Sequence, residues 1–265
     1  MRTSDRVLTN VARGRSARAP RLHAAPSPAQ VVILAAGMGT RLGRSAPKPL
    51  TVLDDGRSIL ARQLDCLRSV LGPDASVTAV VGYRGKKIMK AAPELLFAYN
   101  PDYATTNTSK SLLRALRTSR EGGVLWLNGD VVFDPAVLEL ALPFLRADQS
   151  FVCVDTNTVA EEEVKYTLDE DGFVRELSKT VVGGLGEAVG INYVSAADKP
   201  ALIAQLERCG DQDYFERGME LAVQRDGVRF RPLDISGYVA VEVDFEADLQ
   251  RANTLLPGTP LTEAG

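Results

Sequence analysis

An apolar strand followed directly by a glycine-rich loop is the feature that most constrains this chain. Residues 31–35 are apolar and mostly β-branched, which predicts a strand buried on both faces. In the following loop, Gly37 and Gly39 lack a Cβ, so backbone N–H groups can approach an anion closely. Arg41 adds a fixed fork of donors and Lys48 adds a point charge. The stretch is therefore typical of a site that binds the phosphates of a nucleotide.

Other interpretations of this loop stay open. Its glycines also fit a loose dinucleotide fingerprint, for which an acid about 20 residues later ends a second strand. Asp54 and Asp55 stand near that distance, but in a Leu-Asp-Asp-Gly turn. An NAD(P)-dependent oxidoreductase and a noncatalytic nucleotide-binding regulator are therefore alternatives. A further alternative is an ordinary tight turn with surface cations, which would have no binding role.

The strand and loop resemble the signature of the nucleotidyltransferase superfamily that makes activated sugars and alcohols. The resemblance rests on the Gly-x-Gly-Thr-Arg loop and a later Pro-Lys pair, and it extends over residues 30 to about 252. It implies an α/β, three-layer Rossmann-like fold with a mostly parallel mixed sheet and a small β-hairpin acceptor subdomain. It also implies that Arg41 and Lys48 are the catalytic cations. The nucleotide-binding residues that it implies here are Leu34, Ala35, Ala36, Gly37, Met38, Gly39 and Thr40.

The composition excludes several classes of protein. A net charge of −3 gives no case for nucleic-acid binding. No apolar run approaches the roughly 18 residues of a membrane span. The three cysteines are widely spaced, which favours reduced thiols in a cytoplasmic protein over a zinc site. The single histidine, His23, lies near the N-terminus, so catalysis by a Ser-His-Asp or Cys-His pair in the core is excluded.

The N-terminal segment differs from the rest of the chain. Residues 1–28 carry six arginines against one acid, with many alanines and prolines, which predicts a disordered tail. The segment lacks the apolar core of a secretory signal. A transit peptide is an alternative on composition, although the prolines would interrupt a long amphipathic helix. We expect one nucleotidyltransferase domain over residues 29–265, with an acceptor-binding insertion at about 156–195.

Hydrophobic spacing predicts strands and helices in alternation along this domain. Ser58 and Asp134 are predicted to cap helices. The helices are expected at 60–71, 198–208 and 213–225, with two more after the loops that end near residues 111 and 134. The strands are expected at 77–81, 95–99, 124–127, 151–155 and 190–194, with a hairpin formed by 164–168 and 173–177.

Two loops are candidates for binding the base. Gly82 and Tyr83 follow a predicted strand, at the edge of the sheet where ligands of open α/β proteins bind. Asn107 and Ser111 lie in an Asn-Pro…Tyr…Asn…Ser-Leu segment. This segment resembles the cytidylyltransferases that act on phosphocholine, inositol phosphate and aminoethylphosphonate. That resemblance implies that CTP is the nucleotide, although Tyr83 could instead pack and Asn107 could cap a helix.

Two acids at predicted strand ends are candidates for binding a metal ion. Asp130 follows the strand at 124–127, and Asp244 ends the strand near the C-terminus. An acid in an apolar setting is costly unless it binds a cation. In the resembled family the matching acids bind Mg²⁺, and Asp130 also belongs to the nucleotide site. The alternatives are a turn role for Asp130 and a helix-capping role for Asp244.

The second half of the chain holds the acceptor candidates. The resemblance places lysines of the predicted hairpin against a phosphate or phosphonate. Polar residues on the strand that follows are candidates for the acceptor's head group, although Tyr193 could equally belong to the core. Only one clear aromatic lies in this segment, so an aromatic cage for choline is not evident. The acceptor-binding candidates are Lys165, Lys179, Glu187, Asn192, Tyr193 and Glu242.

The expected reaction is Mg²⁺-dependent transfer of CMP from CTP to a small phosphonate or phosphate monoester, with release of pyrophosphate. A protein nucleophile is not required, because the acceptor oxyanion attacks the α-phosphorus directly. The runner-up is a sugar-1-phosphate nucleotidyltransferase that uses UTP or dTTP. The expected partners are CTP and the acceptor, without nucleic acid or membrane, and a homodimer is an open option.

Overall fold

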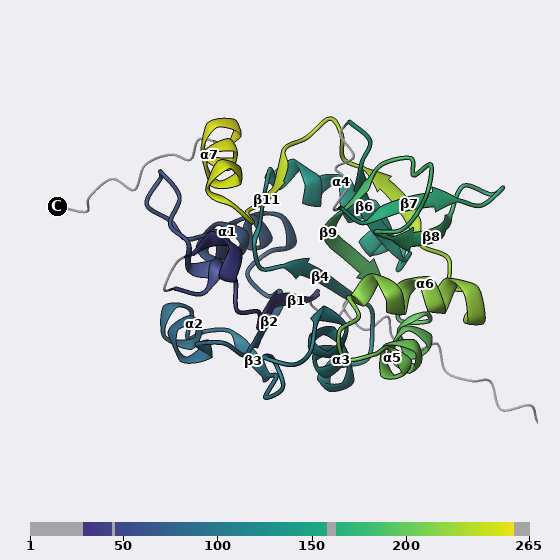
Figure 1. The fold of residues 1–265 in the computed structure, drawn as a ribbon, viewed down its shortest axis with the longest axis horizontal. Coiled ribbons are helices and arrows are strands. Elements are labelled where there is room, and N and C mark those ends of the chain that lie inside the picture. Colours follow the sequence, from purple (N-terminus) through teal and green to yellow (C-terminus); the bar gives the residue numbers. More distant parts are fainter. Residues whose placement is uncertain (1–28, 44–45, 158–162, 257–265) are drawn as a thin grey trace, which may run out of the picture.

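The computed structural model describes residues 29–43, 46–157 and 163–256. The tail that is predicted to be disordered, residues 1–28, lies outside the described residues. Within the described ranges the chain forms three layers, with helices on both faces of a mixed sheet (Figure 1). This arrangement confirms the predicted α/β class.

The strand order of the sheet brings the ends of two central strands together. The order is β10-β6-β9-β4-β1-β2-β3, and β1 runs parallel to both β2 and β4. Only β9 is reversed along this path, because it pairs antiparallel with β4 and with β6. The strands are β1 (Gln30–Ala35), β2 (Ser76–Val81), β3 (Leu96–Tyr99), β4 (Val124–Asn128), β5 (Val131–Phe133), β6 (Phe151–Asp155), β7 (Lys165–Leu168), β8 (Val174–Ser178), β9 (Glu187–Val194), β10 (Arg231–Asp234) and β11 (Ala240–Glu242).

The helices predicted at 60–71, 198–208 and 213–225 are found within two residues of those bounds, whereas α2 was not predicted. Two short 3₁₀ helices, η1 (Thr40–Leu42) and η2 (Lys48–Leu50), follow the glycine loop. The α-helices are α1 (Ile59–Leu71), α2 (Gly85–Ala91), α3 (Thr108–Thr118), α4 (Pro135–Arg146), α5 (Lys199–Arg208), α6 (Phe215–Asp226) and α7 (Glu246–Leu255). None of the described helices is both long and apolar enough to cross a membrane.

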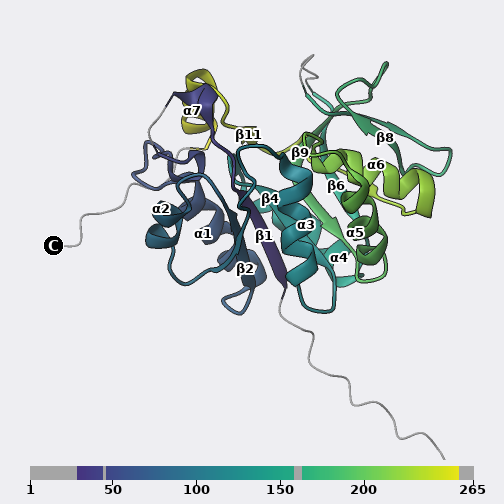
Figure 2. The same cartoon turned by 60° about the horizontal axis from the view of Figure 1, so that its bottom comes forward.

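Both faces of β1 are covered, which explains its continuous apolar sequence. Successive side chains of a strand point to opposite faces. Val31 and Ile33 pack in a core with α1, α2 and α4, whereas Val32 and Leu34 pack in a second core with α3, α5 and α6. In Figure 2, α1 and α2 lie on one side of β1 and α3 lies on the other. The strand therefore ends in a rigid setting, which fixes the loop that follows it.

Two small β-structures stand beside the main sheet. β7 and β8 form the predicted hairpin, and β7 joins the sheet through the pairing of Lys165 with Glu187. β5 and β11 pair antiparallel as a separate two-stranded sheet. β5 is not among the predicted elements, since three residues are too few to give a periodic signal. Its pairing with β11 brings the segment after β4 beside the segment before α7.

The helix caps test two of the predicted roles. The Ser58 hydroxyl accepts from the Ala61 N–H at 3.1 Å, and Asp134 accepts from the Ala136 N–H at 2.8 Å, which confirms both caps. Asp244 does not cap α7. Instead, Asp248 accepts from the backbone N–H of residues 244 and 245. The Asp244 carboxylate instead contacts Arg41 and Lys48.

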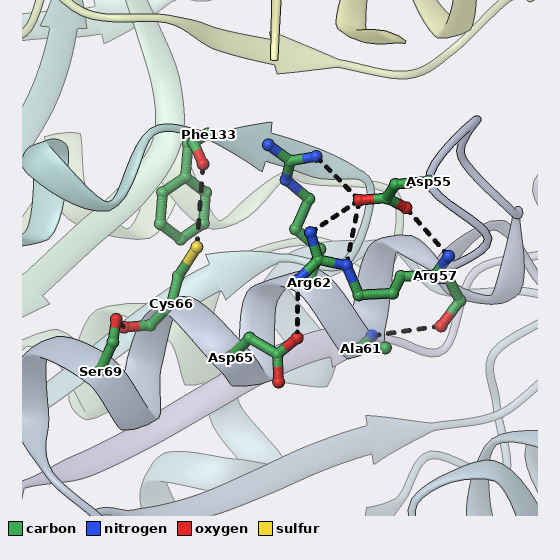
Figure 3. Close-up of polar contacts among 9 residues, drawn as sticks. Asp55, Arg57, Ala61, Arg62, Asp65, Cys66, Ser69 and Phe133 are labelled. Carbon is green, nitrogen blue, oxygen red and sulfur yellow. Dashed lines mark hydrogen bonds and ion pairs between the residues drawn. The ribbon is translucent and has the colours of Figure 1, made fainter. Parts of the chain in front are cut away.

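Asp55 belongs to a buried ion-pair network at the start of α1 (Figure 3). Its carboxylate is 1% exposed and accepts from Arg57 Nη2 at 2.7 Å and from Arg62 Nη1 at 3.2 Å. Burial opposes the charge, but the hydrogen bonds from Arg57 and the charge of Arg62 outweigh it and hold the pKa of Asp55 below 3.8. Because two arginines occupy this acid, it is not placed to bind the ribose of a dinucleotide. The dinucleotide alternative therefore has no support from Asp55.

We expect Asp55→Asn to destabilise the fold by about 3 kcal/mol at neutral pH, because it removes one partner of a buried ion pair. The pKa of Asp55 is lowered in the folded state, so the stabilisation exists above the unfolded pKa and is lost as pH falls through the folded pKa. Urea unfolding of the wild type and the variant should therefore differ at pH 7, and the difference should shrink as the pH falls through the folded pKa of Asp55. Equal stability at pH 7 would contradict this account.

Candidate functional site

A cavity of about 550 Å³ opens at the edge of the sheet where β1 and β4 end. The glycine loop, η2 and the turn after β4 line one side of it. The end of β11, the start of β9 and the first residues of α6 line the other. Every one of these segments begins or ends at the cavity, so its side chains are set by backbone elements of the main fold. We call this space the cleft.

Two of the glycines permit close packing at the cleft. Gly39 has a φ of +59°, which L side chains rarely adopt, and a Cβ there would lie 2.8 Å from the Cγ of Lys48. Gly129 donates its N–H to the carbonyl of Leu34 at 2.9 Å, and a Cβ there would lie 2.6 Å from the same oxygen. The loop after β1 thus packs on Lys48, and the turn after β4 packs on β1.

Lys48 joins the two candidate metal ligands. Its ammonium donates to Asp130 Oδ2 at 3.0 Å and also contacts the carboxylate of Asp244. Arg41 Nη1 lies 2.6 Å from the other oxygen of Asp244. Four residues that are up to 203 positions apart in the sequence therefore meet in one place. The structure brings together the two catalytic candidates and the two metal candidates.

Three hydrogen bonds hold the backbone of the turn that carries Asp130. The side-chain amide of Gln63, which is 1% exposed, donates to the carbonyls of Asn128 and Val131 at 2.8 Å each. The Val243 N–H donates to the carbonyl of Asp130 at 3.0 Å, which ties β11 to the same turn. The separation of Asp130 and Asp244 is therefore set by α1, β4 and β11 together. Gln63 is not among the predicted site residues, because its partners are backbone atoms more than 60 positions away and leave no local pattern.

Charges dominate this part of the cleft. Burial opposes the charge on Lys48, but Asp130 and Asp244 outweigh it, so the pKa of Lys48 is raised. Burial likewise opposes the charge on Asp244, but Lys48 and Arg41 outweigh it and lower the pKa of Asp244. At neutral pH both groups are therefore charged.

The residues fit a magnesium ion that shares its coordination with phosphates. Mg²⁺ is usually held by one or two carboxylates, water molecules and substrate phosphates rather than by a full set of protein ligands. Asp130 and Asp244 supply two carboxylates from separate elements, and a cation, Lys48, already lies against both of them. No group of three or more metal-binding side chains is found in the described part of the chain. The donor set thus suits a metal that arrives with its nucleotide.

One end of the cleft is acidic and adjoins Asp130. Glu242 accepts from Asn128 Nδ2 at 3.1 Å, and burial, with the nearby charge of Asp130, raises the pKa of Glu242 well above 4.5. Glu187 and Glu163 line the same end, together with Glu216 at the start of α6. We call the group of Glu163, Glu216 and Glu242 the acidic end. Lys179 lines the cleft beside it.

About half of the predicted site residues line the cleft. The nucleotide and acceptor candidates found there are Leu34, Ala35, Gly37, Gly39, Arg41, Lys48, Asp130, Lys179, Glu187, Glu242 and Asp244. Ala36 is buried beside the loop, where its carbonyl accepts from the Tyr83 N–H, and Met38 is 44% exposed. Thr40 begins η1. Lys165 lies on the hairpin, where its ammonium donates to the carbonyl of Lys179 at 3.3 Å.

The base-binding candidates lie away from the cleft lining. A Cβ on Gly82 would lie 2.5 Å from the Cβ of Tyr103, so this glycine allows two loops to pack. The ring of Tyr83 is half-buried, and the Arg84 guanidinium lies 5.2 Å from its centre.

Asn107 and Ser111 take part in contacts within the fold. Asn107 accepts from the Thr108 N–H at 2.8 Å, at the start of α3. Ser111 is buried and accepts from Asn100 at 3.1 Å. These contacts agree with the plainer alternatives that the sequence left open, the packing role and the capping role.

Two acceptor candidates are buried in the structure and are not among the residues that line the cleft. Tyr193 is 7% exposed, stacks on Phe151 with ring centres 5.8 Å apart, and donates to Asp148 at 2.6 Å. Asn192 is 1% exposed within the same strand. Both residues lie on β9 between β4 and β6, in the middle of the sheet.

Sequence analysis missed several residues of the cleft. Tyr214, Phe215 and Glu216 line it from the start of α6, although the pattern predicted only a helix in this region. An aromatic pair followed by an acid in the first turn of a helix was a signal that could have been used. Thr108 and Arg251 also line the cleft, from α3 and α7.

Comparison with known proteins agrees with this geometry. Residues 31–219 match the family model of the MobA-like NTP transferase domain. The chain is 31% identical over 254 residues to CMP-5'-(3-aminopropyl)phosphonate synthase of Streptomyces rubellomurinus, and the match covers 85% of this chain. The chain spans 38% of the length of that relative.

Solved structures share the fold. The inositol-1-phosphate CTP transferase of T. maritima has a TM-score of 0.69 and 16% identity, and the match covers 86% of this chain and 97% of that one. The CTP:phosphocholine cytidylyltransferase of Streptococcus pneumoniae has a TM-score of 0.68 and 16% identity, with 86% and 99% covered. With a family model that matches from β1 into α6, the chain belongs to the MobA-like NTP transferase domain family.

Proposed function

We propose that this protein is a cytidylyltransferase that transfers CMP from CTP to a small phosphonate or phosphate monoester. The observation that carries the proposal is the meeting of Lys48 with both Asp130 and Asp244 below the glycine loop. Such a site gathers cations and metal-binding acids where a triphosphate would lie. A protein that only binds a nucleotide would not need two acids at that point.

The reaction is a single displacement at phosphorus. An oxygen of the acceptor attacks the α-phosphorus of CTP, the bond from that phosphorus to the β-phosphate oxygen breaks, and pyrophosphate leaves with the electron pair. The enzyme contributes positioning and charge neutralisation, because the nucleophile is already an oxyanion. Lys48 and Arg41 stabilise the charge that builds on the triphosphate, and the backbone N–H groups of residues 37–40 hold its oxygens.

Two acids of the cleft would hold a magnesium ion. Asp130 and Asp244 are the residues that would hold it. When bound, the ion would neutralise charge on the α-phosphate and the acceptor. Gln63 keeps the two acids at a fixed separation by holding the turn after β4.

The acceptor side of the proposal rests on the second half of the cleft. Lys179 and Glu187 come from the hairpin and from β9, and both line the cleft. Lys48 lies against both metal-binding acids, and a cation there suits a phosphonate or phosphate dianion. The similarity to an enzyme that makes a CMP-phosphonate supports an acceptor of this kind.

The proposal is tested by a pyrophosphate-release screen with purified protein and Mg²⁺. Four nucleoside triphosphates are each combined with 3-aminopropylphosphonate, propylphosphonate, phosphocholine and inositol phosphate. We expect CTP with a phosphonate to give the highest rate. Rates with UTP or dTTP and a sugar 1-phosphate that exceed every CTP rate would support the sugar-nucleotide alternative instead.

We expect CTP to be preferred over UTP by about 10- to 100-fold in kcat/KM. The exocyclic amine of cytosine donates where uracil accepts, and a buried group that loses its partner costs about 1–3 kcal/mol. Competition between the two nucleotides at a fixed acceptor concentration measures the preference. Equal use of both would contradict the assignment of CTP.

Asn107→Ala separates the two roles that the sequence left open for this residue. Since Asn107 accepts from a backbone N–H at the start of α3, we expect the variant to lose about 1 kcal/mol of stability and to keep its CTP preference. A variant that keeps its stability but loses the preference would assign Asn107 to the base.

A further inference from the structure

Glu216 is a buried acid with an unsatisfied oxygen. It is the second residue of α6, is 8% exposed and lines the cleft. Among the described residues, its Oε2 atom has no hydrogen-bond partner and is fully enclosed. A buried carboxylate oxygen without a partner is costly, and in native proteins such atoms usually mark a ligand or a functional role.

The neighbouring charges do not remove this cost. Burial raises the pKa of Glu216 to about 7 from an ordinary 4.5, while its own backbone N–H and the charge of Lys179 act in the opposite direction. Glu163 adds repulsion. The chain itself therefore does not balance a negative charge on Glu216.

The start of α6 fixes Glu216 in place. Phe215 packs edge-on against Trp126 of β4, with ring centres 5.7 Å apart, and both rings are almost fully buried. Tyr214 stands before it, 40% exposed, with the ammonium of Lys179 5.0 Å from the centre of its ring. Tyr214 and Glu216 both line the cleft, and the Tyr214 ring already has a cation beside it. A carboxylate and an aromatic face together are a surface that suits an ammonium group.

We propose that Glu216 selects acceptors that carry a protonated amine at the end opposite the attacking oxyanion. The inference rests on the proposed function, since it names the acceptor class of that same cleft. The anionic end of the acceptor lies toward Lys48 and Arg41, and its ammonium group donates to Oε2 of Glu216. An acceptor without the amine leaves this oxygen buried and unpaired, as it is in the free protein.

The test compares matched acceptors that differ only in the amine. Wild-type kcat/KM is measured with CTP and either 3-aminopropylphosphonate or propylphosphonate, and again with 2-aminoethylphosphonate or ethylphosphonate. We expect the amines to be preferred by about 10- to 100-fold, the usual worth of a hydrogen bond to a charged group. Glu216→Gln should remove the preference by lowering kcat/KM for the amines alone.

Glu220→Gln is the matched control. Glu220 lies on the same helix and is also 8% exposed, but its oxygens are paired with Arg217 and with the Leu177 N–H. It should lose thermal stability and keep the amine preference. Glu216→Gln should instead gain thermal stability at about pH 8, because a raised pKa in the folded state costs stability as pH rises from the unfolded to the folded value.

The outcomes separate the inference from the proposed function. If the wild type transfers CMP to amine and amine-free phosphonates at equal rates, or if Glu216→Gln keeps the preference, the inference is overturned and the proposed function stands. If no acceptor supports pyrophosphate release with any of the four nucleotides, both fall together. A preference that only Glu216→Gln removes supports the inference.

Discussion

Asp130→Asn and Asp244→Asn are each expected to lower kcat by about a thousandfold. Each change keeps the side-chain shape and removes one carboxylate from the pair that would hold Mg²⁺. The loss of one such ligand costs several kcal/mol of transition-state stabilisation, and about 1.4 kcal/mol corresponds to a tenfold change in rate. Both side chains are about a quarter exposed, so the fold should survive either change.

Single-turnover rates at saturating Mg²⁺ and CTP measure this effect. Asp134→Asn is the matched control, since Asp134 caps α4 and does not line the cleft. We expect it to lose at most about 1 kcal/mol of stability and to keep its activity. A near-wild-type rate for Asp130→Asn or Asp244→Asn would show that the residue does not hold the metal.

Lys48→Ala is expected to lower kcat more than it raises the KM for CTP. A cation that meets charge growing in the transition state acts mainly on kcat, whereas uniform binding acts on KM. Lys48 is placed for the first role, because it lies against both acids at the end of β1 rather than on the outer surface. We expect a loss in kcat of about 100-fold or more.

Steady-state kinetics with CTP varied at a saturating acceptor concentration separate the two parameters. Lys86→Ala, an exposed lysine on α2, is the control and should change neither. An unchanged kcat with a raised KM would assign Lys48 to ground-state binding. The variant should also be less stable than the wild type at neutral pH, since Lys48 lowers the pKa of Asp244, and this difference should vanish as pH falls through that pKa.

The nucleotide half of the cleft could be predicted from the sequence because its signals are local. A buried strand, glycines with special conformations and acids at strand ends are each readable within a few residues. Asp130 follows β4 of the main sheet, whereas Asp244 follows β11, which pairs antiparallel with β5 in a separate sheet, so their meeting depends on that pairing. Of the two paired strands, β5 itself was not predicted.

The acceptor half could not be predicted in the same way, because there pairing and packing decide which side chains reach the cleft. Tyr193 has the right composition for a ligand site, but the register of β9 between β4 and β6 places it on Phe151. Glu216 is the reverse case, a residue that the sequence did not predict and that lines the cleft. In the sequence it is an ordinary first-turn acid, and only the packing of Phe215 on Trp126 turns it into a buried group of the cleft.

The proposed reaction is followed by ³¹P NMR of the product that the purified protein forms from CTP and 3-aminopropylphosphonate with Mg²⁺. A single displacement joins the phosphonate oxygen to the α-phosphorus. The account therefore predicts two new signals, one from a phosphonate and one from a phosphate, split by their mutual coupling, together with one pyrophosphate for each product molecule. Pyrophosphate released without a coupled pair of signals, or CTP that stays intact with every acceptor, would contradict it.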